Sequence, residues 1–245
     1  DTENDNLAIG HNALGGGIAG GEYNVAIGNY SLDATTSGDA NTAIGYNSLT
    51  ANTTGNYNTA SGYHALASNT TGSRNTASGN YALTSNTTGV DNTASGYHAL
   101  YSNTEGNYNT ASGRAALYYN TTGSNNTTSG YYALVSNTTG VDNTASGFKA
   151  LYANTTGERN LAIGYQTLDA ADTEDDNLAI GYDALGGAIA GGEFNVAIGN
   201  YSLDATTSGD NNTATGYDAL TGTTTGADNT ALGYDAGDVI TTGSQ

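Results

Sequence analysis

Residues 58–79, NTASGYHALASNTTGSRNTASG, contain one full period of a repeat from which the fold can be predicted. The segment begins and ends on the same NTASG motif, so Gly62 and Gly79 stand at positions i and i+17. This register glycine recurs along the whole chain, eleven times at i+17 and twice at i+18. Such a period predicts a repeat architecture in which each unit stacks on the one before. The register glycines are Gly10, Gly28, Gly45, Gly62, Gly79, Gly96, Gly113, Gly130, Gly147, Gly164, Gly181, Gly199, Gly216 and Gly233.

Three further positions of the repeat are nearly invariant. Alanine stands at i−2 from the register glycine except at Thr128, and leucine stands at i+4 except at Gly237. Asparagine stands at i−4 from every register glycine, at Asn6, Asn24, Asn41, Asn58, Asn75, Asn92, Asn109, Asn126, Asn143, Asn160, Asn177, Asn195, Asn212 and Asn229. Because side chains alternate along a strand, this asparagine, the alanine at i−2 and the register glycine would lie on one face.

We therefore predict an all-β fold, a parallel β-solenoid or β-roll of about fourteen 17-residue coils. Alanine and leucine would fill a narrow core, and the asparagine column would form a hydrogen-bonded ladder between coils. A second glycine usually follows at i+10 from the first, as at Gly72. Both glycines are expected to supply positive φ at the corners of the coil.

Composition excludes several classes of function. The chain carries 23 acidic against 4 basic residues, a net charge of -19, which disfavours nucleic acid and anionic membranes as partners. It has no cysteine, so disulfides and cysteine-based metal sites are excluded. No apolar run is long enough to span a bilayer, so we expect no membrane insertion in this segment. Few large apolar residues with this charge would ordinarily predict disorder, and the repeat overrules that interpretation.

A longer repeat governs the domain organisation. The sequence from Asp1, DTENDNLAIG, returns from Asp172 as DTEDDNLAIG, at i+171. We expect one continuous solenoid over 1–245, made of one block at 1–171 and a partial second at 172–245. Both ends fall within a coil, which suggests a window of a longer fibre or ends that stack on like ends.

The two residues that alternate with asparagine, alanine and glycine would face outward. In six central coils they are threonine and serine, as at Thr93 and Ser95. In five coils nearer the ends both are apolar, and stacked apolar pairs on an outer face need a cover, for which other copies of the chain are the simplest choice. The predicted chain–chain interface comprises Leu7, Ile9, Val25, Ile27, Leu161, Ile163, Leu178, Ile180, Val196 and Ile198.

The motifs NLAIGHNAL, NVAIGNYSL, NTAIGYNSL and NLAIGYQTL resemble the head repeat of YadA-like trimeric autotransporter adhesins. The central GYHALASNTTGSRNTASG units are similar to repeats of tail-fibre-like proteins. The resemblance implies a left-handed β-roll, a homotrimer and a place outside the cell, on a cell or virion surface. It implies a structural shaft or head of an adhesin, tail fibre or surface filament that attaches to a host-surface or glycan receptor. The coils here are longer than the family repeat.

Candidate sites with a chemical role are few. His11, His64 and His98 lie on different coils, and no catalytic triad, carboxylate pair or phosphate loop has usable spacing, so we expect no enzyme and no cofactor. The acidic clusters at 1–5 and 172–176 are interpreted as solvated loops, with Ca²⁺ binding as the alternative. NTTG corners match the glycosylation pattern N-x-[ST] at Asn52, Asn69, Asn86, Asn120, Asn137 and Asn154.

Two surface patterns leave alternatives open. A column of aromatic residues follows the register glycine and predicts either ring packing or a sugar-binding surface. Its members are Tyr46, Tyr63, Tyr97, Tyr131, Phe148, Tyr165, Tyr182, Tyr217 and Tyr234. The outward Thr-x-Ser rows give the main rival function, an ice-binding solenoid. A self-polymerising surface filament formed by end-to-end stacking is a further alternative.

Overall fold

The structure is a computed structural model that describes residues 5–16, 20–187, 191–238 and 241–242. It divides the chain into two compact units, Asp1–Ser124 (unit 1) and Asn125–Gln245 (unit 2), and each is described by itself. No helix is present among the described residues, so no described segment is an apolar helix of bilayer-spanning length. The continuity of one solenoid over 1–245 stays a prediction.

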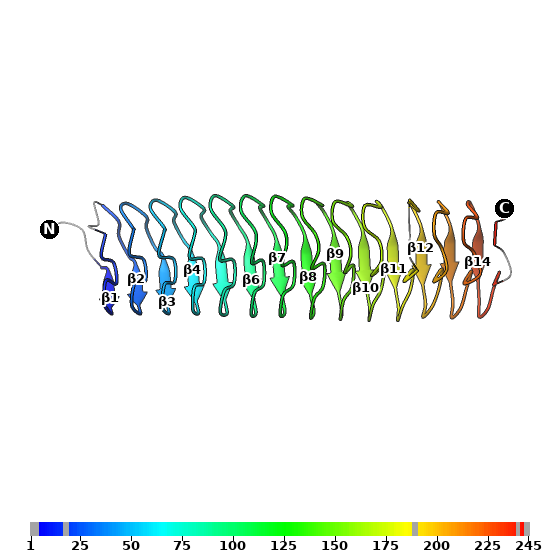
Figure 1. Cartoon of the computed structure of the whole chain (residues 1–245), viewed down its shortest axis with the longest axis horizontal. Helices are drawn as coiled ribbons and strands as arrows, with labels where there is room; N and C mark the ends of the chain where they lie inside the picture. The colour runs from blue at the N-terminus through cyan, green and yellow to red at the C-terminus, as the bar shows by residue number, and fades with distance from the viewer. Residues whose placement is uncertain (1–4, 17–19, 188–190, 239–240, 243–245) are drawn as a thin grey trace. The chain divides into compact units, whose positions relative to one another are not determined.

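Each unit is a parallel β-solenoid, which confirms the predicted fold class. Every coil contributes one short strand, and each strand pairs in register with the strand one coil away, as Ala60 does with Ala77. Figure 1 shows β2, β3 and β4 side by side on successive coils of unit 1. The strands of unit 1 are β1 (Leu7–Ile9), β2 (Val25–Ile27), β3 (Thr42–Ile44), β4 (Thr59–Ser61), β5 (Thr76–Ser78), β6 (Thr93–Ser95) and β7 (Thr110–Ser112).

Unit 2 repeats the same ladder with the same register. The strands are β8 (Thr127–Ser129), β9 (Thr144–Ser146), β10 (Leu161–Ile163), β11 (Leu178–Ile180), β12 (Val196–Ile198), β13 (Thr213–Thr215) and β14 (Thr230–Leu232). Neighbours from β8 to β14 are parallel and directly in register.

The core is as narrow as predicted. Apart from Ala8 and Leu14 of the first coil, the alanines of the strand centres and the leucines that follow are shielded from solvent, as at Ala77 and Leu83 in unit 1 and at Ala179 and Leu185 in unit 2. The small alanine on one wall allows the leucine from the opposite wall to fill the interior. Burial of each leucine contributes about 1.5–3 kcal/mol to folding.

The asparagine column forms the predicted ladder. The Asn58 backbone N–H and side-chain Nδ2 both donate to Asn41 Oδ1, at 2.9 and 3.1 Å. Asn58 Nδ2 also donates to the carbonyl of Gly72 at 2.9 Å, which ties the strand to the corner that follows it. In unit 2, the Asn160 backbone N–H donates to Asn143 Oδ1 in the same way. The column thereby supplies hydrogen-bond partners for the buried asparagine amides of the strands.

The backbone at the corners differs from the prediction. Register glycines do have positive φ, as at Gly62 with φ 145°. Most second glycines, such as Gly72, do not, and the exceptions are Gly20 and Gly191 in the two 18-residue coils. At Gly72 a Cβ atom would instead fall against Asn69 Oδ1 and the Gly89 carbonyl, so lack of space selects glycine there.

Non-glycine residues make the remaining left-handed turns. In one coil of unit 1, Tyr57, His64 and Leu66 have φ of 57°, 54° and 51°. Left-handed conformation is costly for L-residues. Here it is held by backbone hydrogen bonds to neighbouring coils: His64 donates to the Tyr46 carbonyl and Leu66 to the Ala82 carbonyl, both at 3.0 Å.

Candidate functional site

The outward face of the described strands carries only uncharged side chains in each unit. In β4 to β7 the two outer residues of every strand are exposed and the central one is buried. None of the strands that the structure describes contains a charged residue, whereas the chain as a whole has a net charge of -19. The acidic residues therefore lie outside the strands, and the strand face is a neutral strip.

The predicted interface residues all lie on this outward face. In unit 1, Leu7 and Ile9 are 47% and 55% exposed, and they pair with Val25 and Ile27 of the next strand. Sequence reasoning omitted Ile44, which extends the row from Ile27 and is exposed; its register position was the available signal.

Unit 2 has an equivalent aliphatic patch on β10, β11 and β12. One row is Leu161, Leu178 and Val196, and the other is Ile163, Ile180 and Ile198. All six side chains are at least partly exposed. Their location is confirmed, and their role in contacts between chains stays a prediction.

Hydroxyl rows occupy the same face on β4 to β7 of unit 1. Thr59, Thr76, Thr93 and Thr110 pair in sequence along one row, and Ser61, Ser78, Ser95 and Ser112 along the other. All eight are exposed. The parallel register gives these hydroxyls a regular spacing of about 4.8 Å along the ladder.

The aromatic residues after the register glycines stack on one another. In unit 2, Phe148 and Tyr165 have ring centroids 4.9 Å apart at an interplanar angle of 10°, and Tyr165 and Tyr182 lie 5.1 Å apart at 4°. In unit 1, Tyr46 and Tyr63 stack in the same way at 5.4 Å and 11°. Rings in such columns cover each other's faces, so they offer their edges and hydroxyl groups to solvent. This arrangement favours ring packing over the stacking of sugars on ring faces.

The three histidines are part of this aromatic surface of unit 1. His98 stacks on Tyr97 with centroids 3.9 Å apart, and His64 stacks on Tyr81 at 5.5 Å. Partial burial, with a smaller contribution from the charge of Arg114, lowers the pKa of His98. His11 contacts Tyr30 edge-on.

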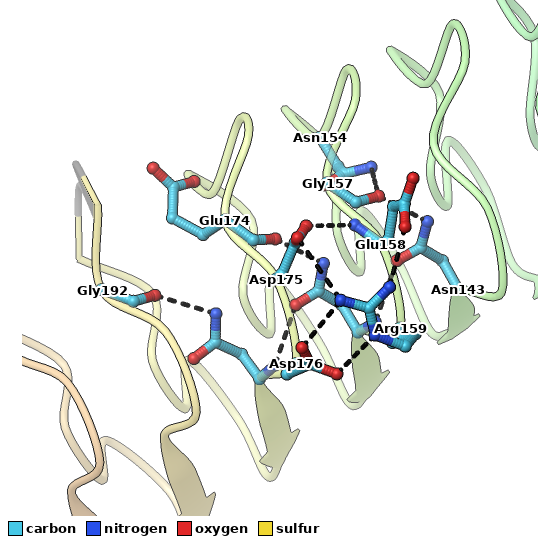
Figure 2. A network of polar contacts seen from close by, with 11 residues as sticks. Asn143, Asn154, Gly157, Glu158, Arg159, Glu174, Asp175, Asp176 and Gly192 are labelled. Atoms are coloured by element: carbon cyan, nitrogen blue, oxygen red, sulfur yellow. Dashed lines mark hydrogen bonds and ion pairs between the residues drawn. The ribbon is translucent and has the colours of Figure 1, made fainter.

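An ion-pair network occupies the second acidic cluster, in unit 2 (Figure 2). Arg159 forms a two-pronged pair with Asp176, through Nε at 2.7 Å and Nη2 at 2.8 Å. It also contacts Glu158 and Asp175. The hydrogen bond from Arg159 lowers the pKa of Asp176. Within the described residues, no group of three or more acidic or histidine side chains is arranged to hold a metal ion.

Glu174 departs from the prediction of a solvated loop. It is only 4% exposed, and its carboxylate accepts backbone N–H groups of Asp172, Thr173 and Gly191 at 2.7, 3.0 and 2.9 Å. The carboxylate therefore joins the corner of one coil to the next. Asp1 and Glu3 of the first acidic cluster lie outside the described residues.

The glycosylation prediction is wrong for the folded chain. Asn52, Asn69, Asn86, Asn120, Asn137 and Asn154 are all fully buried. Their amides form a second ladder: Asn69 Nδ2 donates to Asn52 Oδ1 at 2.9 Å and to the Gly72 carbonyl at 2.9 Å. A glycan needs the exposed Nδ2 atom, which is here a buried donor. The recurrence of these asparagines at the same register position of successive coils was the signal for a structural role.

No protein-family model matches the chain, and no curated protein matches its sequence.

Proposed function

We propose that this protein is a non-catalytic structural fibre, the shaft or head of an adhesin, tail fibre or surface filament outside the cell. Copies of the chain associate side by side, three to a fibre, through the outward strand face. The observation that carries the proposal is a charge-free face with in-register aliphatic rows on a chain of net charge -19.

The physical reason is the balance of repulsion and burial. Copies with this charge repel one another, and the neutral strand face is where they approach at least electrostatic cost. The patch of Leu161, Ile163, Leu178, Ile180, Val196 and Ile198 gains from removal from water at about 25 cal/mol per Å². Stacked coils with paired backbones then provide a stiff support, and residues at the outer corners meet the receptor.

The test is the mass of the purified chain in solution by light scattering, with and without Ile180→Glu. We expect the parent to have about three times the 24.6 kDa of one chain. The substitution places a charge in the aliphatic patch and should give single chains. Thr139→Glu is the matched control, because Thr139 is exposed at a corner position where Glu105 stands in another coil. A parent of single-chain mass would refute association through this face.

Ice binding is the second candidate, and the exposed hydroxyl rows of β4 to β7 favour it. Regular hydroxyls on a flat face match the requirement for ordering water. Thermal hysteresis of the parent chain that disappears on Thr93→Lys would establish this function. Absence of hysteresis in the parent would reject it.

A further inference from the structure

Unit 2 contains a continuous column of parallel aromatic rings on successive coils. Tyr131, Phe148, Tyr165 and Tyr182 follow one another, with centroids 5.6, 4.9 and 5.1 Å apart and interplanar angles of 3°, 10° and 4°. Tyr165 and Tyr182 are each 42% exposed, so both phenols are open to small reagents. The column thus holds two accessible phenols face to face.

The composition makes tyrosine the principal target of oxidation. The chain has 19 tyrosines and no cysteine, methionine or tryptophan. Cysteine and methionine are the side chains that usually react first with oxidants. Without them, an electron lost from the protein comes from a phenol.

We propose that Tyr165 and Tyr182 form an oxidative cross-linking site, at which a peroxidase-type one-electron oxidant joins the two rings by a carbon–carbon bond between their ortho positions. Each phenol loses one electron and one proton, and the two radicals couple. Both ring carbons then lose their hydrogen as the rings regain aromaticity and the phenol oxygens regain their protons. Hydrogen peroxide is the terminal oxidant: its O–O bond breaks, it accepts the two electrons and two protons, and two waters are released.

The backbone around the pair favours coupling within one chain. Asp183 N–H donates to the Tyr165 carbonyl at 3.0 Å, and Gly181 N–H donates to the Ile163 carbonyl at 2.9 Å. These bonds hold the two coils at a fixed separation, so each radical has a partner ring close by. Such proximity raises the effective concentration far above that of rings on separate molecules. The half-exposed rings retain room to turn from stacked to bonded geometry.

The resulting bond would join equivalent positions on adjacent coils. Like a disulfide, the bond would stabilise the fold by lowering the conformational entropy of the unfolded chain, in a protein that has no cysteine. A covalent link between coils would keep the ladder from separating under load.

The experiment treats the full chain with a haem peroxidase and hydrogen peroxide, then digests it and identifies linked peptides by mass spectrometry. We expect a product in which the peptides of Tyr165 and Tyr182 are joined with the loss of two hydrogens, together with dityrosine fluorescence. Tyr182→Phe should abolish this product. Phenylalanine is tolerated in the column, since Phe148 already stacks on Tyr165.

The native Phe148 supplies a gain-of-function test. It stacks on Tyr165 as closely as Tyr182 does but has no phenol to oxidise. Phe148→Tyr should therefore create a new 148–165 product. Tyr57 is the reference for exposure alone, because it is 65% exposed and lies outside the column. Tyr57→Phe should leave the 165–182 product unchanged.

A mixture of isotopically light and heavy chains distinguishes coupling within a chain from coupling between chains. We expect 165–182 products that are wholly light or wholly heavy. Mixed products alone, or no 165–182 product while other tyrosines are oxidised, would overturn the proposal. Neither result depends on whether the chains associate as a fibre.

Discussion

Asn75, one of the buried asparagines at i−4 from the register glycines, is hydrogen-bonded to both neighbouring coils. Asn75 N–H donates to Asn58 Oδ1, and Asn75 Oδ1 accepts from the backbone and the amide of Asn92. Its Nδ2 donates to the Gly89 carbonyl. An amide side chain has one acceptor and one two-proton donor, and this geometry uses both. Aspartate has the same shape but lacks the donor, which explains why asparagine occupies every coil.

Two carboxylates of unit 2, Asp169 and Asp204, have pKa shifts opposite to that of Asp176. Partial burial, then the charge of Asp183, raises the pKa of Asp169 above 3.8, although Gln166 and Lys149 act in the other direction. Burial also raises the pKa of Asp204, followed by Asp183, Asp169 and Asp218. Asp176, by contrast, is paired with Arg159 and its pKa is lowered.

Removing the charge at Asp183 should stabilise the fold in a pH-dependent way. A carboxyl whose folded pKa is raised costs stability above that pKa, and the cost disappears as pH falls toward 3.8. We expect Asp183→Asn to have a higher unfolding temperature than the parent at pH 7, with the difference shrinking as pH falls through the raised pKa values. Asparagine also tolerates the left-handed backbone at this position, where φ is 53°.

The measurement is thermal unfolding of both proteins by circular dichroism from pH 7 to pH 4. Asp228→Asn makes the same charge change at an exposed residue that does not act on Asp169 or Asp204. It should give a smaller difference that does not follow this pH course. An Asp183→Asn effect that is constant with pH would contradict the assignment of repulsion to these carboxylates.

At the scale of the coil, the corner is built from two residues that constrain one another. In seven coils a buried asparagine is followed at i+3 by glycine, as at Asn154 and Gly157. A Cβ atom on Gly157 would meet Asn154 Oδ1, so the asparagine and a larger corner residue exclude each other. The next coil has Ala171 and Glu174 instead.

The replacement of asparagine and glycine by Ala171 and Glu174 interrupts the second asparagine ladder. Ala171 provides no amide, and Asn154 Oδ1 is buried without a hydrogen-bond partner in the described structure. Glu174 replaces the lost contacts by accepting three backbone N–H groups. The coil therefore uses a carboxylate where its neighbours use an amide.

A double-mutant cycle tests this exclusion. Ala171→Asn alone should destabilise unit 2, because the new amide meets the Glu174 side chain. Glu174→Gly alone should destabilise it too, since each buried unpaired N–H costs about 1–3 kcal/mol. The double variant restores the corner chemistry of the other coils, with an amide that donates to Asn154 Oδ1.

We expect the double variant to unfold at higher denaturant concentration than either single variant. The coupling free energy should fall within the range of about 0.5–3 kcal/mol found for contacting residues. Additive effects in urea unfolding would show that the two positions are independent and that the corner has another basis.

At the scale of the whole molecule, charge is segregated from the strand face. The excess of 23 acidic over 4 basic residues disfavours anionic partners. The outward strand positions are left to aliphatic and hydroxyl residues, in blocks: aliphatic on β10 to β12, hydroxyl on β4 to β7. The proposed association through the aliphatic block of β10 to β12 and the alternative of ice binding by the hydroxyl block of β4 to β7 therefore involve different strands.

Much of the fold could be predicted because the same residue types recur at the same positions of successive coils. The strand positions, the alanine and leucine core and the Asn6-to-Asn229 column all follow from 17-residue recurrence and strand alternation. The corners could not be predicted in the same way. Leucines such as Leu66 are poor candidates for a left-handed backbone, and only hydrogen bonds with adjacent coils hold them there.

The candidate sites were harder to predict than the fold. N-x-[ST] at Asn52 is a local pattern, and its burial depends on Asn69 of the next coil, which the local pattern does not contain. The local sequence predicts a solvated Glu174, because the N–H of Gly191 that binds its carboxylate belongs to the next coil and is not part of that local pattern.

The amino-acid sequence is enough to assign which residues form the coil, which face inward and which recur, because periodicity records the local geometry of one turn. The three-dimensional arrangement is needed to establish which polar groups are buried, which glycines need space rather than positive φ, and which rings stack. Those properties arise between coils, where atoms far apart in the chain come within hydrogen-bonding or van der Waals distance.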